Sequence, residues 1–482
     1  MKKKVIGVVS ALVLVVVMAV GLVACNPYKW SAIGGGDSSA EVESNGGYAV
    51  KQGKYLYYIN GYDGTGGSGN EWGAPVKQSI VRSELDEDGN VVNSTTKVVV
   101  PKIIYNSSAK GGFAIYDEWI YYATPNNDRD KNGTASTTDT DFMRTKINGS
   151  ITQRLGKIDS RDSEYLFTKS RIWYYKSSTL SYIDFSGMKT DKNIDNASGA
   201  KNGEFATNVS SVAWDMNSER IYYTQDVTGA NSYKNYNELY SVKIDGSGKR
   251  LIATEDTFVT EKDEDDKKIP EAQPQNVFKY NLRGIYVEKP ADDQITETIY
   301  YTKTHHIEDD ETDGLFCANV TLADSATAIV ESEIKIEESG ATTLIPLGYQ
   351  EGAIVNVNSG YYWFKPGEEA VEVFNASKNI ALVDQEEGIV YFTDTSTASS
   401  LQKISYKEKN ATASIVISEG IKVDWLKLDF IDDDFYFFAT DDSNYMHTIN
   451  VKTFDKTAED EDGNLIGSTY IGFERDEESE EE

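Results

Sequence analysis

The sequence predicts an all-β protein built from repeated units. Clusters of aromatic residues recur along most of the chain, and turn-forming pairs such as Asp88-Gly89 and Asn148-Gly149 follow them at matching places. Beyond the apolar N-terminal segment of residues 1–24, no segment of ten or more residues has the periodicity of an amphipathic helix. The composition agrees, because the chain contains 31 tyrosines, 17 phenylalanines and 7 tryptophans, and large aromatic side chains favour strand surfaces.

The aromatic clusters are spaced regularly enough to predict an architecture. Their mean spacing is about 54 residues, close to the period of roughly 40–50 residues that indicates propeller blades. The clusters are Tyr57-Tyr58-Ile59, Tyr121-Tyr122-Ala123, Trp173-Tyr174-Tyr175, Tyr222-Tyr223-Thr224, Tyr300-Tyr301-Thr302, Tyr391-Phe392-Thr393 and Tyr436-Phe437-Phe438. Between Tyr301 and Tyr391, a weaker equivalent without aromatic residues, Ala353 to Val357, takes the same place and leads into Tyr361-Tyr362-Trp363-Phe364.

One unit cannot bury both faces of its own sheet, whereas sheets stacked in a ring can, and a closed ring leaves only short protected edges. We therefore predict a single β-propeller of seven or eight four-stranded blades over residues 48–455. The alternative is two or three β-sandwich domains. A sandwich, however, does not require the same aromatic doublet at a nearly constant period.

Three of the clusters also carry a family resemblance. Tyr391-Phe392-Thr393-Asp394 is similar to the YWTD tetrapeptide of the low-density-lipoprotein-receptor type propeller. The segments that begin at Tyr222 and Tyr300 resemble looser copies of it. Similar propellers occur in bacterial surface lipoproteins of unassigned function, so the resemblance implies the fold and leaves the ligand open.

The N-terminus has the pattern of an export signal. Three lysines at positions 2–4 precede an apolar run, and this run ends in Leu22-Val23-Ala24-Cys25. These four residues resemble the lipobox of bacterial lipoproteins. The resemblance implies that residues 1–24 are a signal peptide cleaved before Cys25. The Cys25 thiol then carries lipid and anchors the chain to the extracytoplasmic face of the bacterial cell membrane. The alternative is an uncleaved transmembrane helix, because about 20 apolar residues can span a bilayer.

Three further segments are predicted to lie outside the blades. Residues 25–47 are rich in glycine and serine and are expected to form a flexible tether. Residues 255–275 form an acidic insertion, which is read as a solvated loop or, alternatively, as a binding element on a propeller face. Residues 456–482 are expected to form a disordered acidic tail.

One loop has oxygen-bearing residues at the spacing of a calcium site. In the segment 128–139 these are Asp128, Asp130, Asn132, Thr134, Ser136 and Asp139, with Gly133 at the turn. Alternate oxygen-bearing residues in a tight loop can direct several ligands at one Ca²⁺ ion. The last position is Asp rather than Glu, and no helices flank the loop. A polar hairpin loop without metal is therefore the alternative reading.

The charge and the scarcity of catalytic residue types restrict the function. A net charge of −31 excludes binding to nucleic acid, because phosphates would be repelled. Two cysteines and three histidines leave little material for metal clusters or for Cys–His catalysis, and Cys317 lies in an apolar stretch that predicts a buried thiol. We expect a non-enzymatic module that binds an extracellular protein, peptide or envelope glycan. The alternative is an envelope polysaccharide hydrolase or lyase with carboxylates at the channel.

The lipid anchor can be tested directly. Replacing Cys25 with alanine should abolish fatty-acid labelling and release the protein from the membrane, since the thioether to the lipid can no longer form. The measurement is metabolic labelling with a palmitate analogue, with Cys317→Ala as the matched control that should keep the label. Labelling that persists in the Cys25 variant contradicts the assignment.

The calcium loop predicts a metal-dependent stability. Free Ca²⁺ at 100 times its dissociation constant stabilises a folded protein by about 2.7 kcal/mol, so millimolar Ca²⁺ should raise the melting temperature and a chelator should lower it. Asp128→Asn combined with Asp130→Asn should remove this response. A melting temperature that ignores both Ca²⁺ and chelator argues for the metal-free hairpin loop.

Overall fold

The computed structural model describes most of the chain beyond residue 31. The described residues are 32–43, 45, 47–60, 79–104, 112–126, 139–158, 164–194, 196–226, 237–253, 278–288, 295–305, 313–320, 333–337, 343–375, 378–394, 401–417, 421–431, 434–441, 446–450, 455–459, 465–466 and 468–472. They form strands and turns, and no helix occurs among them. Within this part of the chain there is consequently no helix of the length and apolarity needed to cross a membrane.

The described strands form seven four-stranded sheets, one five-stranded sheet and a short hairpin. The five-stranded sheet contains β1 (Val42–Glu43), β2 (Ala49–Gln52), β3 (Tyr55–Ile59), β4 (Ile80–Leu85) and β5 (Val91–Val100). The next three contain β6 (Phe113–Tyr116), β7 (Trp119–Pro125), β8 (Thr140–Lys146) and β9 (Thr152–Ile158); β10 (Glu164–Phe167), β11 (Arg171–Lys176), β12 (Thr179–Asp184) and β13 (Lys201–Thr207); and β14 (Val209–Ala213), β15 (Arg220–Asp226), β16 (Asn237–Lys243) and β17 (Arg250–Ala253).

The second half of the chain continues the same order. Its sheets contain β18 (Phe278–Glu288), β19 (Thr296–His305), β20 (Gly314–Val320) and β21 (Ile334–Glu337); β22 (Leu344–Gly348), β23 (Gly352–Val357), β24 (Gly360–Phe364) and β25 (Val371–Phe374); β26 (Lys378–Asp384), β27 (Ile389–Asp394), β28 (Leu401–Ser405) and β29 (Ser414–Ile417); and β30 (Ile421–Ile431), β31 (Asp434–Asp441), β32 (Met446–Asn450) and β35 (Ser468–Ile471). The hairpin is β33 (Asp455–Glu459) with β34 (Leu465–Ile466).

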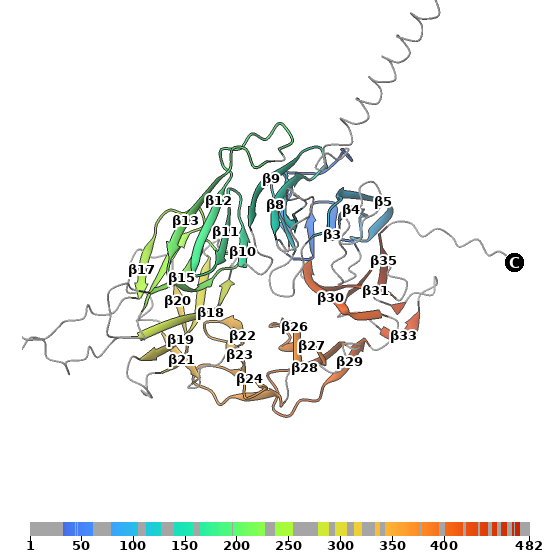
Figure 1. Ribbon diagram of the computed structural model, residues 1–482. Coiled ribbons are helices and arrows are strands. Elements are labelled where there is room, and N and C mark those ends of the chain that lie inside the picture. Colours follow the sequence, from blue (N-terminus) through green and yellow to red (C-terminus); the bar gives the residue numbers. More distant parts are fainter. Residues whose placement is uncertain are drawn as a thin grey trace, which may run out of the picture.

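These sheets follow one another around a ring in the order of the sequence (Figure 1). Strands in corresponding positions of neighbouring sheets contact one another: β2 contacts β6 and β30, and β18 contacts β14 and β22. These strands therefore lie nearest the axis of the ring. The last strand of each sheet therefore lies at the rim. The predicted all-β propeller of four-stranded blades is confirmed by the seven four-stranded sheets, and the five-stranded sheet lies between the first and the last of them.

Side-chain hydrogen bonds between the five-stranded sheet, which is first in the sequence, and the β30–β35 sheet, which is last, close the ring. The Asn93 side chain on β5 donates to the Tyr470 carbonyl at 3.1 Å and accepts from the Gly472 amide at 3.0 Å. The Thr96 hydroxyl donates to the Gly472 carbonyl at 2.8 Å. Ile471 packs into the apolar core of the first sheet. The two ends of the ring are thus joined without sharing a strand.

The aromatic doublets form the core between neighbouring sheets. Consecutive strand residues point to opposite faces, so Tyr122 packs toward the β1–β5 sheet and Tyr121 toward the β10–β13 sheet. In the same way Tyr223 packs toward the β10–β13 sheet, and Tyr222 toward the β18–β21 sheet. Tyr57 and Tyr58 are both 0% exposed. The doublets at Tyr121-Tyr122 and Tyr222-Tyr223 therefore fill the space on both sides of their own sheets.

In five of the described sheets, two hairpins lie together on one face of the ring, called here the turn face. They are the first and third hairpins of a four-stranded sheet, and the β2–β3 and β4–β5 hairpins of the five-stranded sheet are counted as equivalent to them. The residue that begins the third hairpin donates its amide to a carbonyl in the first hairpin of the same sheet. These pairs are Leu85 with Lys54, Ile147 with Glu118, Phe185 with Ser170, Ile244 with Glu219 and Tyr406 with Gly388. The opposite face of the ring carries the ends of β7 and β8, which flank the predicted calcium loop. It also carries the ends of β17 and β18, which flank the acidic insertion.

The predicted tether is ordered in its second half. The Ile33 amide donates to the Asn148 carbonyl at 2.9 Å, and the Gly34 carbonyl accepts from the Arg82 guanidinium at 2.7 Å. Farther along, β1 pairs with β2. These contacts hold residues 33–43 against the first two sheets. The Gly/Ser composition did not reveal them, because the contacts of Ile33 and Gly34 are made with residues more than 40 positions away.

The propeller also extends beyond residue 455. Strand β35 lies inside the segment 456–482 that was expected to be an acidic tail, and it pairs with β32 as the fourth strand of the last sheet. Residues 1–31, with the predicted signal peptide and Cys25, lie outside the described residues, as do residues 255–275 and 473–482.

Candidate functional site

A cavity of about 310 Å³ opens on the turn face between three consecutive sheets. Its apolar lining comes from Tyr116, Leu166, Phe167, Met216 and Ile244, and its polar lining from Thr168, Lys169, Ser170, Ser218 and Asp245. These residues belong to the first hairpins of the β6–β9, β10–β13 and β14–β17 sheets and to the third hairpin of the β14–β17 sheet. Stacking of the sheets around the ring brings these hairpins together.

Hydrogen bonds fix the cavity walls. The Tyr116 hydroxyl donates to the Phe167 carbonyl at 3.0 Å, which ties the wall of one sheet to the next. The Thr168 hydroxyl donates to the Arg171 carbonyl at 2.9 Å and accepts from the Arg171 amide at 3.0 Å. The Asp215 amide donates to the Ser218 hydroxyl at 3.0 Å. The cavity is therefore largely preformed, as is usual for ligand sites.

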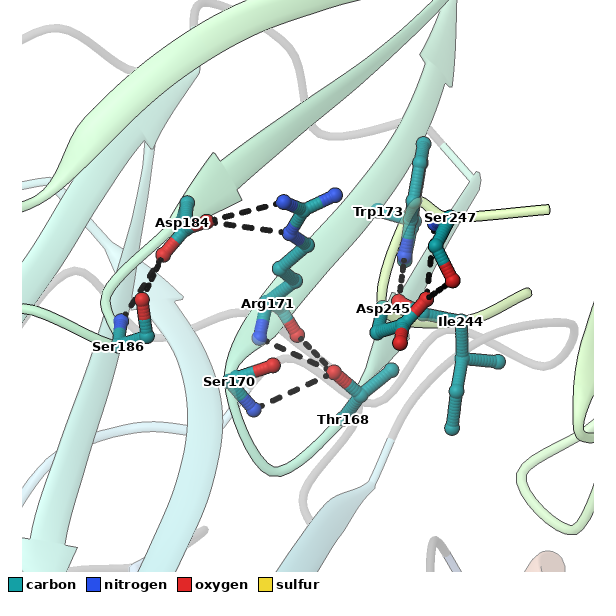
Figure 2. A network of polar contacts seen from close by, with 9 residues as sticks. All are labelled: Thr168, Ser170, Arg171, Trp173, Asp184, Ser186, Ile244, Asp245 and Ser247. Atoms are coloured by element: carbon teal, nitrogen blue, oxygen red, sulfur yellow. Dashed lines mark hydrogen bonds and ion pairs between the residues drawn. The ribbon is translucent and has the colours of Figure 1, made fainter. Parts of the chain in front are cut away.

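Arg171 follows the cavity-lining residues Thr168, Lys169 and Ser170 and binds Asp184 at the third hairpin of its own sheet (Figure 2). Its Nε and Nη2 lie 3.2 and 3.1 Å from Asp184 Oδ2. Asp184 Oδ1 accepts from the Ser186 amide at 3.0 Å and from the Ser186 hydroxyl at 2.6 Å. Burial opposes ionisation of Asp184, but these hydrogen bonds and the guanidinium charge outweigh it and lower the pKa of Asp184. The ion pair is therefore present at neutral pH.

The neighbouring sheet contributes its third turn to the same network. The Trp173 indole donates to the Ile244 carbonyl at 2.7 Å (Figure 2). The Asp245 carboxylate accepts from the Ser247 amide at 2.8 Å and the Ser247 hydroxyl at 2.7 Å, and these bonds lower the pKa of Asp245. A fixed, ionised carboxylate thus lies at the edge of the cavity.

Gly246 follows Asp245 in this turn and has a φ of +82°. A Cβ atom at this position would lie 1.7 Å from Arg171 Nη1. Glycine is required here for two reasons, because the backbone is left-handed and because the guanidinium occupies the space of a side chain. The turn and Arg171 are therefore packed as one unit.

Lys169 and Arg171 beside the cavity have acidic partners, whereas Asp245 has no basic partner at ion-pair distance among the described residues. The Lys169 ammonium lies 3.2 Å from Asp117 Oδ1, and Arg171 is paired with Asp184. Lys243 and Arg171 are near enough to Asp245 to lower its pKa. Among the described residues, however, no cation is within ion-pair distance of the Asp245 carboxylate. The lining therefore presents one accessible negative charge beside an apolar wall.

A second cavity, of about 430 Å³, lies at the rim between the β22–β25 and β26–β29 sheets. Val371, Val373, Phe374 and Ile404 form its apolar side. Lys409 lies there too, with its ammonium 2.6 Å from Glu369 Oε2. Ala370 and the segment 409–411, which belong to the third hairpins of these two sheets, also line it, so this cavity reaches the turn face as well.

Of the predicted calcium ligands, only Asp139 belongs to the described residues, and its Oδ2 lies 3.1 Å from Lys157 Nζ. The positions of Asp128, Asp130, Asn132, Thr134 and Ser136 lie outside them, and so do Leu22, Val23, Ala24 and Cys25. In the described part of the chain, no three His, Cys, Asp or Glu side chains are grouped in a way that could hold a metal ion.

A buried charge cluster next to Asp139 is not evident from the sequence. The Asp141 carboxylate is fully buried, 2.6 Å from Arg154 Nη2 and 2.7 Å from the Asn126 amide. Burial raises the pKa of Asp141 and lowers the pKa of nearby Lys102 to about 8. Cys317 is buried as predicted, and burial raises the pKa of its thiol to about 12.

The sequence also did not reveal the cavity on the turn face. In the sequence, Asp245-Gly246 has the composition of an ordinary turn, and no pattern distinguishes Arg171. The one available signal was the repetition of such turns in successive units, which places them on one face once the ring is known.

Comparisons with known proteins give structural similarity only. No protein-family model matches the sequence, and no curated protein matches it. The chain is similar to a prolyl endopeptidase at 10% identity and a TM-score of 0.39, over 83% of this chain and 55% of the other. It thus spans about half of that enzyme. It is also similar to the Dos1 propeller, at 12% identity and a TM-score of 0.37, over 73% and 80% of the two chains. A third similar structure is a eukaryotic initiation factor, at 11% identity and a TM-score of 0.35, over 81% and 90%.

The Arg171 packing predicts a difference between two glycine substitutions. Gly246→Ala should destabilise the protein more than Gly89→Ala, although the two residues have φ values of +82° and +85°. Both variants incur the cost of a left-handed residue, about 1–2 kcal/mol. Only at Gly246 must the new methyl displace Arg171 from Asp184, because nothing lies within 4 Å of a Cβ at Gly89. Denaturant unfolding measures the difference, and equal losses would contradict the role of Arg171.

Proposed function

We propose that this chain is a lipid-anchored extracytoplasmic propeller that binds a protein, peptide or envelope glycan through its turn face. The observation that carries the proposal is the preformed cavity between three sheets, with an apolar wall and few polar groups. This combination is typical of binding sites. The propeller itself supports the proposal only as a scaffold, because the same fold carries unrelated functions.

The anchor belongs to the proposal. A signal peptide over residues 1–24 and lipid on Cys25 would hold the ring at the outer surface of the cell membrane. Lipid chains contribute about 0.8 kcal/mol for each buried CH₂, and two or more chains give stable attachment. Residues 33–43 lie against the ring, so they do not act as a free tether.

The cavity chemistry favours binding over hydrolysis. Glycoside hydrolysis needs two carboxyl groups about 5–10 Å apart across the scissile bond. Among the described residues that line the cavity, Asp245 is the single carboxylate. Its hydrogen bonds with Ser247 keep it ionised, whereas a general acid must hold a proton.

Site-specific cross-linking tests the proposed function. A photoreactive benzoylphenylalanine at Lys169, which is exposed and lines the cavity, should cross-link to a component of the cell envelope on irradiation. The matched control is the same residue at Lys201, an exposed position on the rim strand β13, which should give no adduct. The readout is a shifted band on a denaturing gel, detected through the chain itself.

Two outcomes contradict this proposal. Equal cross-linking at both positions would mean that contact is non-specific, and no adduct at Lys169 would mean that the turn face does not bind. Release of soluble carbohydrate from envelope polysaccharide by the purified chain would instead support the hydrolase or lyase.

A further inference from the structure

We propose that the cavity on the turn face binds the side chain of a lysine or arginine within a peptide segment of the partner. This inference rests on the proposed function and names the chemistry that its site would recognise. Three observations carry it: the size of the cavity, its apolar wall and the position of Asp245.

The cavity fits one long side chain. Its volume of about 310 Å³ lies at the lower end of the range of ligand pockets, roughly 300–1,000 Å³. Leu166, Phe167, Met216 and Ile244 provide an apolar wall. Lysine and arginine bury their methylene stems along such surfaces while the charged end stays near polar groups. A short or strongly branched side chain would leave part of this wall exposed to water.

Asp245 provides the partner for the charged end. One of its oxygens is held by Ser247, which fixes the carboxylate without neutralising it. No described cation is within ion-pair distance of Asp245, while Lys169 and Arg171 both have acidic partners. A hydrogen bond between an ammonium or guanidinium group and a carboxylate is about twice as strong as a neutral one. A bound cation would therefore complete the charge balance of the cavity.

An anionic ligand fits this site poorly. It would face the Asp245 carboxylate and a chain of net charge −31, and Lys169, the one cation in the described lining, is already paired with Asp117. The same net charge attracts basic segments over distances of about one Debye length, roughly 8 Å at physiological ionic strength. Both the contact with Asp245 and the longer-range attraction of the net charge thus favour a basic peptide.

Peptide pools test the inference with the full chain purified in detergent and immobilised. Each pool contains nonapeptides with one fixed central residue and randomised uncharged flanks, and the central residue is lysine, arginine, norleucine or glutamate. The lysine and arginine pools should bind at least about tenfold more tightly than norleucine, which has the stem without the charge. The glutamate pool should not bind. Raising the salt concentration should weaken the lysine pool and leave norleucine unchanged.

Two matched aspartate variants locate the interaction. Asp245→Asn keeps the acceptor for Ser247 and should weaken the lysine pool about tenfold. Asp86→Asn is the control, because Asp86 also accepts amide hydrogen bonds in a third-hairpin turn but does not line the cavity. It should leave binding unchanged. Thermal melting checks that both variants fold, and the salt dependence of the wild-type chain tests the charge requirement without any substitution.

Several results would overturn the inference. They are equal binding of the lysine and norleucine pools, no loss in Asp245→Asn, or competition by free cadaverine at the same concentration as the lysine pool, which would identify a free amine as the ligand. Such results leave the cross-linking at Lys169 intact. Failure of that cross-linking contradicts the proposed function itself, so the two failures are distinguishable.

Discussion

The structure depends on burying both faces of every sheet. A four-stranded sheet with two tyrosines in succession on one strand has apolar surface on both sides, and a single sheet cannot cover it. The ring solves this because each sheet packs against two neighbours, as Tyr121 and Tyr122 show on opposite sides of β7. Since the first sheet also needs a second neighbour, Asn93 and Thr96 bind the end of the last sheet and close the ring.

The same packing requires buried polar groups to find partners between sheets. Glu297 is fully buried and accepts hydrogen bonds from the Tyr222 hydroxyl and the Glu219 amide of the adjacent sheet. Burial raises the pKa of this carboxyl group. The Trp173 indole and the Tyr300 hydroxyl likewise bond to backbone carbonyls in the next sheet. These contacts fix the orientation of each sheet to its neighbour, which apolar packing alone leaves loosely defined.

Orientation of the sheets in turn produces the site. The hairpins of the turn face approach one another only because the sheets are stacked at a fixed angle, and the cavity is the space that three of them leave. Arg171 and Gly246 maintain this arrangement on one side, and Tyr116 maintains it on the other. The candidate site is thus a consequence of ring packing, and the residues that support it lie mostly outside the cavity.

The sequence by itself determined the all-β class, the repeat and the ring, because aromatic doublets at a constant period express the need to bury two faces. It also provided the prediction of a lipid-modified Cys25, which is a local motif. The tertiary structure decided where the ring begins and ends: residues 33–43 and β35 belong to it through contacts with distant residues, so composition suggested a tether and a tail instead. It also decided the cavity and the role of Asp245. Asp245 and Tyr116 are more than a hundred residues apart, and no local pattern records that they line the same space.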